Sequence, residues 1–530
     1  MKKAYKILIL IGIMLTVLLG ICFCIYLTLK TPEPQNTELE TLYVGVTEGD
    51  YTYTVFSDYT CEITGYSGTD TKLKVPRVIN TCTVVGIGSH AFENCSTLME
   101  VKLPSTVRYI EYRAFADCGL LKEVSLPKAL NYVGIEAFYG SDELQKVVFK
   151  GDVTKVETSA FEGCDSIVSV FFKKGVGELG NRAFFGCLAL TEIELGNDLS
   201  SVGNYAFGNC RSLTEADLGE TLTEIGLRAF DGCTSLSEIV IPDTVTKIGR
   251  YAFEGTPWRE NASGYVVVGK GILAAAGYDI GADIVIPDGV LFIGDAFEGR
   301  TDITSLVVSD TVTEIGDGAF MGCTSLSSAV IPDSVSKLGS YVFYGCESLG
   351  EVSLPSGLSD VGVFCFTDTL WVESGDFVIG GDGILFGCNV SGKNVTVPEN
   401  VKYIAEAFFE TEYRSVTLCD SVEKILPHAF GLCETLEKVS FGSNITEIGE
   451  GAFSGCSGLS AVTLYDGLVT LEKECFADCY ALDEINLPSS LEYVGEDAFV
   501  RCESLEEVVW DVSENAVIED GNEALKKLIN

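Results

Sequence analysis

Residues 222–255 read LTEIGLRAFDGCTSLSEIVIPDTVTKIGRYAFEG, and the motif I-G-x-x-A-F-x-G occurs twice in this stretch. Its phenylalanine recurs along most of the 530-residue chain, usually 23 residues after the previous copy. A step held this regularly indicates an internal repeat, which decides the fold before any other feature does. These marker phenylalanines are Phe92, Phe115, Phe138, Phe161, Phe184, Phe207, Phe230, Phe253, Phe297, Phe320, Phe343, Phe366, Phe408, Phe430, Phe453, Phe476 and Phe499.

Each copy has enough apolar residues for one strand and no partner to cover them. In the copy that begins at Leu222, the segment 236–241 alternates apolar and other residues, which predicts a β-strand. Pro242 has no amide donor and can end that strand, and Gly226 suits a tight corner. Because a lone copy leaves its apolar face uncovered, neighbouring copies must stack and share one core. The sequence therefore predicts a mainly β solenoid.

One copy carries a clear family resemblance. The segment 103–124, LPSTVRYIEYRAFADCGLLKEV, fits the pattern LPxxVxxIGxxAFxxCxxLxxV, except that Glu111 stands where the pattern has glycine. In this pattern the chain resembles the BspA-type leucine-rich repeat, also known from Treponema surface proteins, over roughly residues 83–510. The resemblance implies a leucine-rich-repeat solenoid. It also implies a surface-exposed binding or adhesion protein rather than an enzyme.

Two steps of the marker are about twice as long and divide the repeats into three arrays. Both long steps contain Thr-x-Trp and then a related segment, YVVVGKGIL or FVIGGDGIL, which predicts a β-hairpin. Before the first copy, YTYTVF and CEITGY predict a β-hairpin cap, and the tail loses the repeat. We therefore predict a cap at 43–82, arrays at 83–255, 291–366 and 401–510, inserts at 256–290 and 367–400, and a C-terminal cap or tail at 511–530.

The amino terminus has the pattern of a membrane anchor. Lys2, Lys3 and Lys6 precede the charge-free residues 7–29, which as a helix would be about 34 Å long and could cross a bilayer core of about 30 Å. The basic end is expected to stay in the cytoplasm. One transmembrane helix at 1–30 and a polar stalk at 31–42 would then place the other residues outside the cell. The alternative is a cleaved signal peptide and a secreted protein.

Charge and histidine content argue against several classes of function. The formal net charge is −42 at pH 7, which repels phosphate backbones, so nucleic acid is not expected as a partner. The chain contains two histidines, which argues against histidine metal sites and against catalysis by a serine–histidine or cysteine–histidine pair. We therefore expect no enzyme activity, no cofactor and no metal site.

The cysteines follow the repeat. Other copies have Ser141, Thr256, Thr369, Thr411 or Arg300 in the same slot, so it favours a small side chain that can hydrogen-bond in a turn. Equivalent side chains of stacked copies point in parallel, which favours free thiols over disulfides. In the cap, Cys61 and Cys82 are a pair to test for a bridge. Of the 20 cysteines, twelve lie three residues after a marker phenylalanine: Cys95, Cys118, Cys164, Cys187, Cys210, Cys233, Cys323, Cys346, Cys433, Cys456, Cys479 and Cys502.

The outward residues of the strands carry the candidate binding site. In the segment L-x-x-V-x-L the third and fifth residues point outward, and successive copies place carboxylates there. An apolar side chain, expected to be exposed, precedes them. A patch for a basic partner or a cation is one interpretation, and a solvated face of an acidic protein is the other. The candidate residues are Phe171, Glu192, Glu194, Glu215, Asp217 and Glu238.

These features predict a membrane-anchored scaffold at the plasma membrane, with most of the chain outside the cell. It would bind an extracellular protein or glycan, and its acidic strands favour a basic partner. Two alternatives stay open. The chain could be a structural spacer or an envelope-assembly protein without a specific ligand, or an enzyme with a site at one of the inserts.

Overall fold

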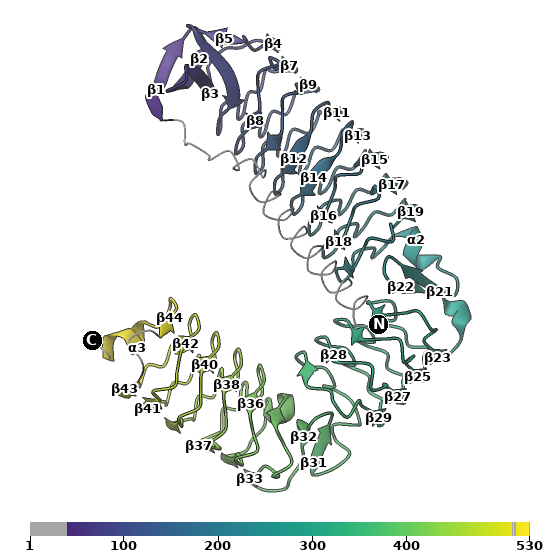
Figure 1. The fold of residues 1–530 in the computed structure, drawn as a ribbon, viewed down its shortest axis with the longest axis vertical. Helices are drawn as coiled ribbons and strands as arrows, with labels where there is room; N and C mark the ends of the chain where they lie inside the picture. Colours follow the sequence, from purple (N-terminus) through teal and green to yellow (C-terminus); the bar gives the residue numbers. More distant parts are fainter. Residues whose placement is uncertain (1–39, 511, 513–515, 529–530) are drawn as a thin grey trace, which may run out of the picture.

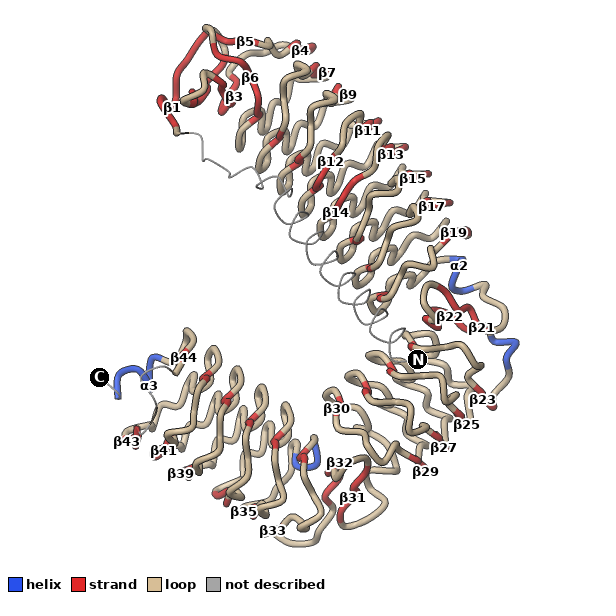
Figure 2. Tube along the Cα trace, in the orientation of Figure 1, coloured by secondary structure: helices blue, strands red, loops and turns tan. Residues whose placement is uncertain are grey.

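The computed structural model describes residues 40–510, 512 and 516–528, and these coil into a solenoid that curves as an open hook (Figure 1). The predicted transmembrane segment at 1–30 and residues 31–39 of the predicted stalk lie outside the described residues. Within the described ranges, no helix is long and apolar enough to cross a membrane. The hook bends at the two inserts (Figure 2).

Each turn contributes one short strand to an outer sheet on the convex side of the hook (Figure 1). Neighbouring outer strands are parallel, and the sheet is interrupted at both inserts. The outer strands are β4 (Lys72–Lys74), β7 (Glu100–Lys102), β9 (Glu123–Ser125), β11 (Lys146–Phe149), β13 (Ser169–Phe172), β15 (Glu192–Glu194), β17 (Glu215–Asp217) and β19 (Glu238–Val240), then β23 (Asp283–Val285), β25 (Ser305–Val307), β27 (Ser328–Val330) and β29 (Glu351–Ser353), and finally β33 (Asn394–Thr396), β35 (Ser415–Thr417), β37 (Lys438–Ser440), β39 (Ala461–Thr463), β41 (Glu484–Leu487) and β43 (Glu507–Trp510).

A second strand of each turn, usually two residues long, forms an inner sheet on the concave side (Figure 1). The inner sheet is interrupted at the same two places. Its repeat strands are β8 (Tyr109–Ile110), β10 (Tyr132–Val133), β12 (Val153–Val156), β14 (Val176–Leu179), β16 (Ser201–Val202), β18 (Glu224–Ile225) and β20 (Lys247–Ile248), then β24 (Phe292–Ile293), β26 (Glu314–Ile315), β28 (Lys337–Leu338) and β30 (Asp360–Val361), and finally β34 (Tyr403–Ile404), β36 (Lys424–Ile425), β38 (Glu447–Ile448), β40 (Thr470–Leu471), β42 (Tyr493–Val494) and β44 (Val517–Ile518).

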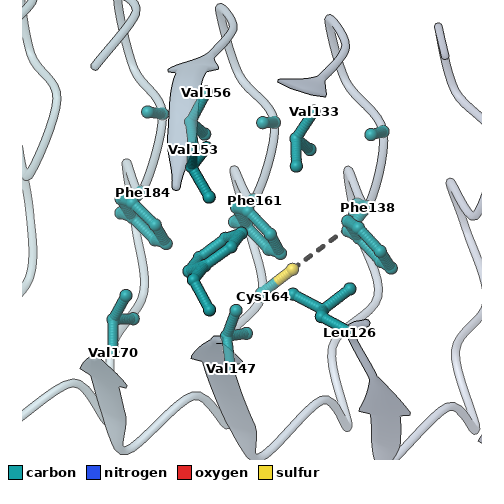
Figure 3. Packing of buried hydrophobic residues seen from close by; sticks show 14 of the residues in the cluster. Leu126, Val133, Phe138, Val147, Val153, Val156, Phe161, Cys164, Val170 and Phe184 are labelled. Atoms are coloured by element: carbon teal, nitrogen blue, oxygen red, sulfur yellow. Dashed lines mark hydrogen bonds between the residues drawn. The ribbon is translucent and has the colours of Figure 1, made fainter. Parts of the chain in front are cut away.

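The marker phenylalanines form the centre of the core between the two sheets. The rings of Phe138, Phe161 and Phe184 stack with centroid separations of 4.9 and 5.1 Å and nearly parallel planes (Figure 3). Val147 from the outer sheet and Val156 from the inner sheet enclose this row. Since burial of one such aromatic side chain contributes about 2 kcal/mol, each turn is stabilised mainly by its neighbours, as expected for a solenoid.

Thiols of the repeated cysteine slot hydrogen-bond between turns. The Cys164 thiol donates to the carbonyl of Phe138, 26 residues earlier, over 3.1 Å (Figure 3). Where the slot has Ser141, its hydroxyl makes the same bond to the carbonyl of Phe115 at 2.8 Å. Burial raises the pKa of the Cys164 thiol well above its usual range, so the thiol stays a donor. Every cysteine in the described residues is free, and for the twelve in the repeated slot this agrees with the prediction from their parallel positions.

The amino-terminal cap is larger than the predicted hairpin at 43–82. It contains antiparallel strands β1 (Thr41–Glu48), β2 (Tyr51–Phe56) and β3 (Thr60–Tyr66), and β1 begins inside the segment predicted as a stalk. β5 (Val78–Ile79) and β6 (Cys82–Ile87) follow, and β6 connects the cap to the inner sheet. Cys61 and Cys82 are not bridged, and the Cys61 thiol lies 3.7 Å from the Cys82 carbonyl.

The solenoid begins before residue 83. Strand β4 already pairs in register with β7, because Lys72 lies opposite Glu100 and Lys74 opposite Lys102. This first step is 28 residues long. It is therefore hidden from a search for a step of 23.

Both inserts contain an antiparallel hairpin. The first consists of β21 (Tyr265–Val268) and β22 (Ile272–Ala276), preceded by α2 (Pro257–Glu260) and followed by η1 (Tyr278–Ile280). The second consists of β31 (Phe377–Gly380) and β32 (Ile384–Cys388), with η2 (Glu406–Phe408) in the turn that follows. Helix α2 was not expected from the sequence. The Thr256 hydroxyl caps it by accepting the Arg259 N–H at 3.3 Å.

The carboxyl-terminal end of the third core is covered by the tail. Strand β44 adds to the inner sheet, and Leu525 of α3 (Glu523–Leu528) is fully buried. The buried side chain of Asn522 donates to the carbonyl of Gly495 at 2.8 Å. The described part of the predicted segment 511–530 thus lies as a cap on the last turn.

Candidate functional site

Four outer strands carry all six candidate residues. Strands β13, β15, β17 and β19 are parallel and in register, so equivalent residues of successive turns lie side by side. Because alternate residues of a strand face the same side, two rows form on the solvent face. One row is Ser169, Glu192, Glu215 and Glu238, and the other is Phe171, Glu194, Asp217 and Val240.

The two rows border a shallow groove of about 340 Å³. All six candidate residues line it, so the structure brings the predicted set together. Phe171 is half-buried rather than exposed as expected, and the Lys146 ammonium lies 5.8 Å from its ring centroid. Val240 at the other end of the same row is 79% exposed. The groove therefore has exposed carboxylates along its length and an apolar side chain at each end of one row.

The carboxylates of this groove lie next to others of the same charge. Glu215 is opposite Glu192 on one side and Glu238 on the other, and Glu194 is opposite Asp217. None of the five forms an ion pair with any described residue. Like charges directly opposite one another destabilise a sheet by up to about 1 kcal/mol per pair. This face of the protein therefore carries a stability cost that a polar but uncharged row would avoid.

The inner sheet is in register as well, but it places charges of opposite sign next to one another. At several neighbouring turns it has charges of opposite sign, and these meet as ion pairs. These pairs are Lys155–Glu178 at 3.7 Å, Lys247–Glu224 at 2.5 Å, Lys337–Glu314 at 3.2 Å and Lys424–Glu447 at 2.7 Å. The repeat can therefore place opposite charges on neighbouring turns, but the outer strands β15, β17 and β19 place like charges there.

A basic region precedes the acidic rows on the same outer sheet. Lys72, Lys74 and Lys102 line a second groove of about 300 Å³, where they outnumber Glu100 and Glu123. Lys146 on β11 continues this region toward Phe171. Lys72 and Lys74 were not predicted from sequence, because β4 lies outside the 23-residue step. The start of this outer sheet therefore has more cations than carboxylates, whereas its outward charged residues on β15, β17 and β19 are all carboxylates.

The chemistry of the groove is that of exposed carboxylates with apolar side chains at the ends of one row. In the part of the chain that the structure describes, no group of His, Cys, Asp or Glu side chains is arranged to hold a metal ion. Exposed carboxylates in two parallel rows can accept hydrogen bonds from lysine or arginine side chains. The apolar ends of the groove can cover the aliphatic parts of those side chains.

The repeat can be compared with known families. The model described as the BspA type leucine rich repeat region, with six copies, matches residues 71–189, 132–260, 281–379 and 382–506. The chain belongs to the BspA-type leucine-rich repeat family. Between residues 71 and 506, the matches to this family are interrupted only inside the two inserts. The first hairpin, β21–β22, lies in the unmatched segment 261–280, whereas the second, β31–β32, lies within the matched ranges except for its turn at 380–381.

Several solved structures resemble this BspA-type chain. A leucine-rich repeat protein from Bacteroides ovatus is 21% identical, and the match covers 90% of this chain and 99% of that one with a TM-score of 0.35. A leucine rich cell surface protein from Faecalibacterium prausnitzii is 21% identical, with 92% and 98% covered and a TM-score of 0.29. The leucine rich repeat protein of T. pallidum is 19% identical, with 57% and 90% covered and a TM-score of 0.22. No curated protein matches the chain in sequence.

Proposed function

We propose that this protein is a cell-surface scaffold that binds an extracellular protein or glycan through its outer sheet. The acidic rows of β15, β17 and β19 are proposed as the contact for a basic segment of a partner. One observation carries the proposal: carboxylates of like charge are stacked here, whereas the inner sheet pairs its charges. A face that lowers the stability of the free protein is expected where a partner supplies the missing charge.

The spacing of the strands favours an extended partner. Neighbouring strands of a sheet lie about 4.8 Å apart, so a basic segment crossing them meets new carboxylates at every turn. Each ammonium or guanidinium group of the partner would relieve repulsion between two turns as well as gain an ion pair. Binding of this kind weakens as salt is added, because the carboxylates are exposed to solvent.

Anchoring to the membrane is part of the proposal. The basic residues Lys2, Lys3 and Lys6 and the apolar residues 7–29 support a single transmembrane helix with the repeats outside the cell. Mass spectrometry of the mature protein from a membrane fraction tests this arrangement. A peptide that contains residues 1–30 is expected, and a mature chain that starts after residue 30 would indicate secretion instead.

The binding test uses the full-length chain and two charge-matched variants. The first replaces Glu192, Glu215 and Glu238 with Gln. The second replaces Asp283 with Asn and Glu351 and Glu484 with Gln, three exposed acids at the same strand position on other turns. The probes are a ten-residue lysine peptide and a panel of extracellular matrix proteins, measured by surface plasmon resonance.

We expect the first variant to lose at least tenfold in affinity for a bound probe and the second to stay within twofold of the parent. Equal losses would mean that only the net charge attracts the probe, and no loss would remove the acidic rows from the function. The spacer alternative predicts a different result. In that case no probe binds, and a chain that lacks two whole turns in register still works in the cell.

A further inference from the structure

A second recessed site lies on the concave side, where the first insert interrupts the inner sheet. Strand β20 ends one sheet and does not pair with β22, which belongs to the next sheet. A crevice of about 560 Å³ remains between them. This volume is in the range of sites that hold small molecules, about 300–1,000 Å³. The crevice is separate from the acidic groove, because the groove lies on the outer sheet.

The floor of the crevice is apolar and contains one aromatic ring. Ile248, Ile272 and Phe292 line it together with Gly294 and Gly316. A Cβ atom on Gly316 would lie 2.5 Å from the tip of the Phe292 ring, so the glycine allows the ring to lie against the next turn. Because Phe292 is only half-buried, the rest of its ring faces the opening.

The walls of the crevice are charged but balanced. Three cationic and three anionic side chains line it, so the crevice carries no net charge in a chain whose net charge is −42. This balance distinguishes it from the acidic groove and from the basic region on the outer sheet. The side chains are Lys247, Arg250, Lys337, Asp295, Glu314 and Asp317.

Neighbouring groups hold these walls in place. Arg250 spans the break in the sheet and is 2.7 Å from Glu298. Lys337 is 3.2 Å from Glu314, and Asp317 accepts the Ser340 N–H at 2.8 Å. Each ammonium group has three donors and each carboxylate about four acceptor positions. Donors and acceptors are therefore left over for a ligand, in positions that are already ordered.

We propose that this crevice binds a neutral sugar residue of a glycan. A pyranose ring has an apolar face of C–H groups, which can stack on Phe292, and a rim of hydroxyls, each of which both donates and accepts. The hydroxyls fit a rim that alternates between ammonium or guanidinium donors and carboxylate acceptors. A strongly charged ligand would meet as many like charges as opposite ones. The site and its ligand class are independent of the proposed contact at the acidic rows.

The test uses the full-length chain in a detergent without a sugar headgroup. The probes are tetrasaccharides of glucose, N-acetylglucosamine, mannose and galactose, observed by saturation-transfer NMR and titrated for affinity. Phe292→Ala removes the stacking surface, and Lys337→Ala removes one exposed wall group. Tyr132→Ala is the matched control, because Tyr132 holds the corresponding position of an inner strand in the first array.

We expect at least one tetrasaccharide to bind the parent chain. Phe292→Ala should weaken it at least tenfold and Lys337→Ala severalfold, while Tyr132→Ala and the Glu192, Glu215 and Glu238 variant should stay within twofold. Thermal unfolding shows whether Phe292→Ala is folded, and Lys337→Ala decides the question if it is not. The proposal is wrong if none of the four tetrasaccharides binds the parent, or if binding is unchanged by the substitutions in the crevice.

Discussion

The turns that follow the two inserts are shorter by one residue than the regular turns. In a regular turn the buried inner-strand residue precedes the marker by five positions, as Ile225 precedes Phe230. Ile293 and Ile404, in the turns after the inserts, precede their markers by four. In a regular turn, the backbone carbonyl at the missing position accepts a hydrogen bond from the turn before it.

A carboxylate replaces this carbonyl at both inserts. In a regular turn, the residue two before the marker has a left-handed φ and donates its N–H to the next turn, as Arg182 does at φ 56° over 2.8 Å. Before the first insert, the Tyr251 N–H donates to Asp295 Oδ2 at 2.7 Å. Before the second, the Phe364 N–H donates to the carboxylate of Glu406. The bond along the solenoid axis is thus kept across each bend by a side chain.

The two carboxylates differ in their electrostatic surroundings. Asp295 lies 2.8 Å from the guanidinium of Arg259 on α2. The equivalent residue of the second insert is Val372, which offers no cation. Burial raises the pKa of Glu406 from 4.5 to about 7. One bend is therefore stabilised by an ion pair, and the other by a carboxyl group that is about half protonated at neutral pH.

The largest effect is expected from Asp295→Ala. It leaves the Arg259 side chain, which is 15% exposed, without the nearer of its two acidic partners. Breaking a buried pair in this way costs about 3 kcal/mol, and hydrogen exchange of the Tyr251 amide should speed up accordingly. Glu254→Ala is the control, because that carboxylate is 3.5 Å from Arg259 but 48% exposed, and it should cost less than about 0.5 kcal/mol. Equal costs for the two variants would contradict the special role of Asp295.

Glu406→Gln should remove a pH dependence from the second bend. Between pH 4.5 and about 7 the folded chain keeps a proton that the unfolded chain releases, so the free energy of unfolding falls as pH rises through this window. The shift corresponds to at most about 3 kcal/mol, and partial exposure of the side chain reduces this to about 2 kcal/mol. The variant keeps an acceptor for the Phe364 N–H and should show a flat profile.

Urea unfolding and exchange of the Phe364 amide between pH 5 and 8 measure this difference. Asp368→Asn is the control, because Asp368 lines the same small crevice but the Phe364 N–H donates to Glu406. If the parent chain shows no change of stability across the window, the carboxyl group does not govern this bend.

The regular turns and the hairpin in each insert could be predicted from sequence, and the hydrogen bonds that hold the bends could not. The stacked core and the outer rows depend on a step of 23 and an alternation of two, which residues such as Phe230 and Glu215 display directly. The inner strands are mostly two residues long, too short to show any alternation. The bonds of Asp295 and Glu406 join residues 44 and 42 positions apart, and they form only because each hairpin loops out.

A moderate effect is expected in the cysteine slot, which also differs between regular turns and inserts. The Cys187 thiol donates to the carbonyl of Phe161 in the preceding turn at 3.3 Å, whereas the Thr256 hydroxyl donates within its own turn at 2.7 Å. Cys187→Ala should cost about 1 kcal/mol in urea unfolding. Cys187→Ser should cost less than about 0.5 kcal/mol, because Ser141 already makes this bond. If alanine were tolerated as well as serine, the bond between turns would not matter.

The smallest expected effect is the change in stability when one carboxylate is removed from the outer or from the inner sheet. Glu215→Gln removes a charge that lies between Glu192 and Glu238, so it should stabilise the chain by a few tenths of a kcal/mol. Glu447→Gln on the inner face removes the partner of Lys424 at 2.7 Å and should destabilise by a similar amount. Both differences should vanish in 1 M salt, where the Debye length is about 3 Å. Opposite signs at low salt would show that the acidic rows are kept at a cost to stability. If Glu215→Gln instead destabilised the chain, the carboxylates would already be satisfied within it, and the physical reason to expect a basic partner there would be gone.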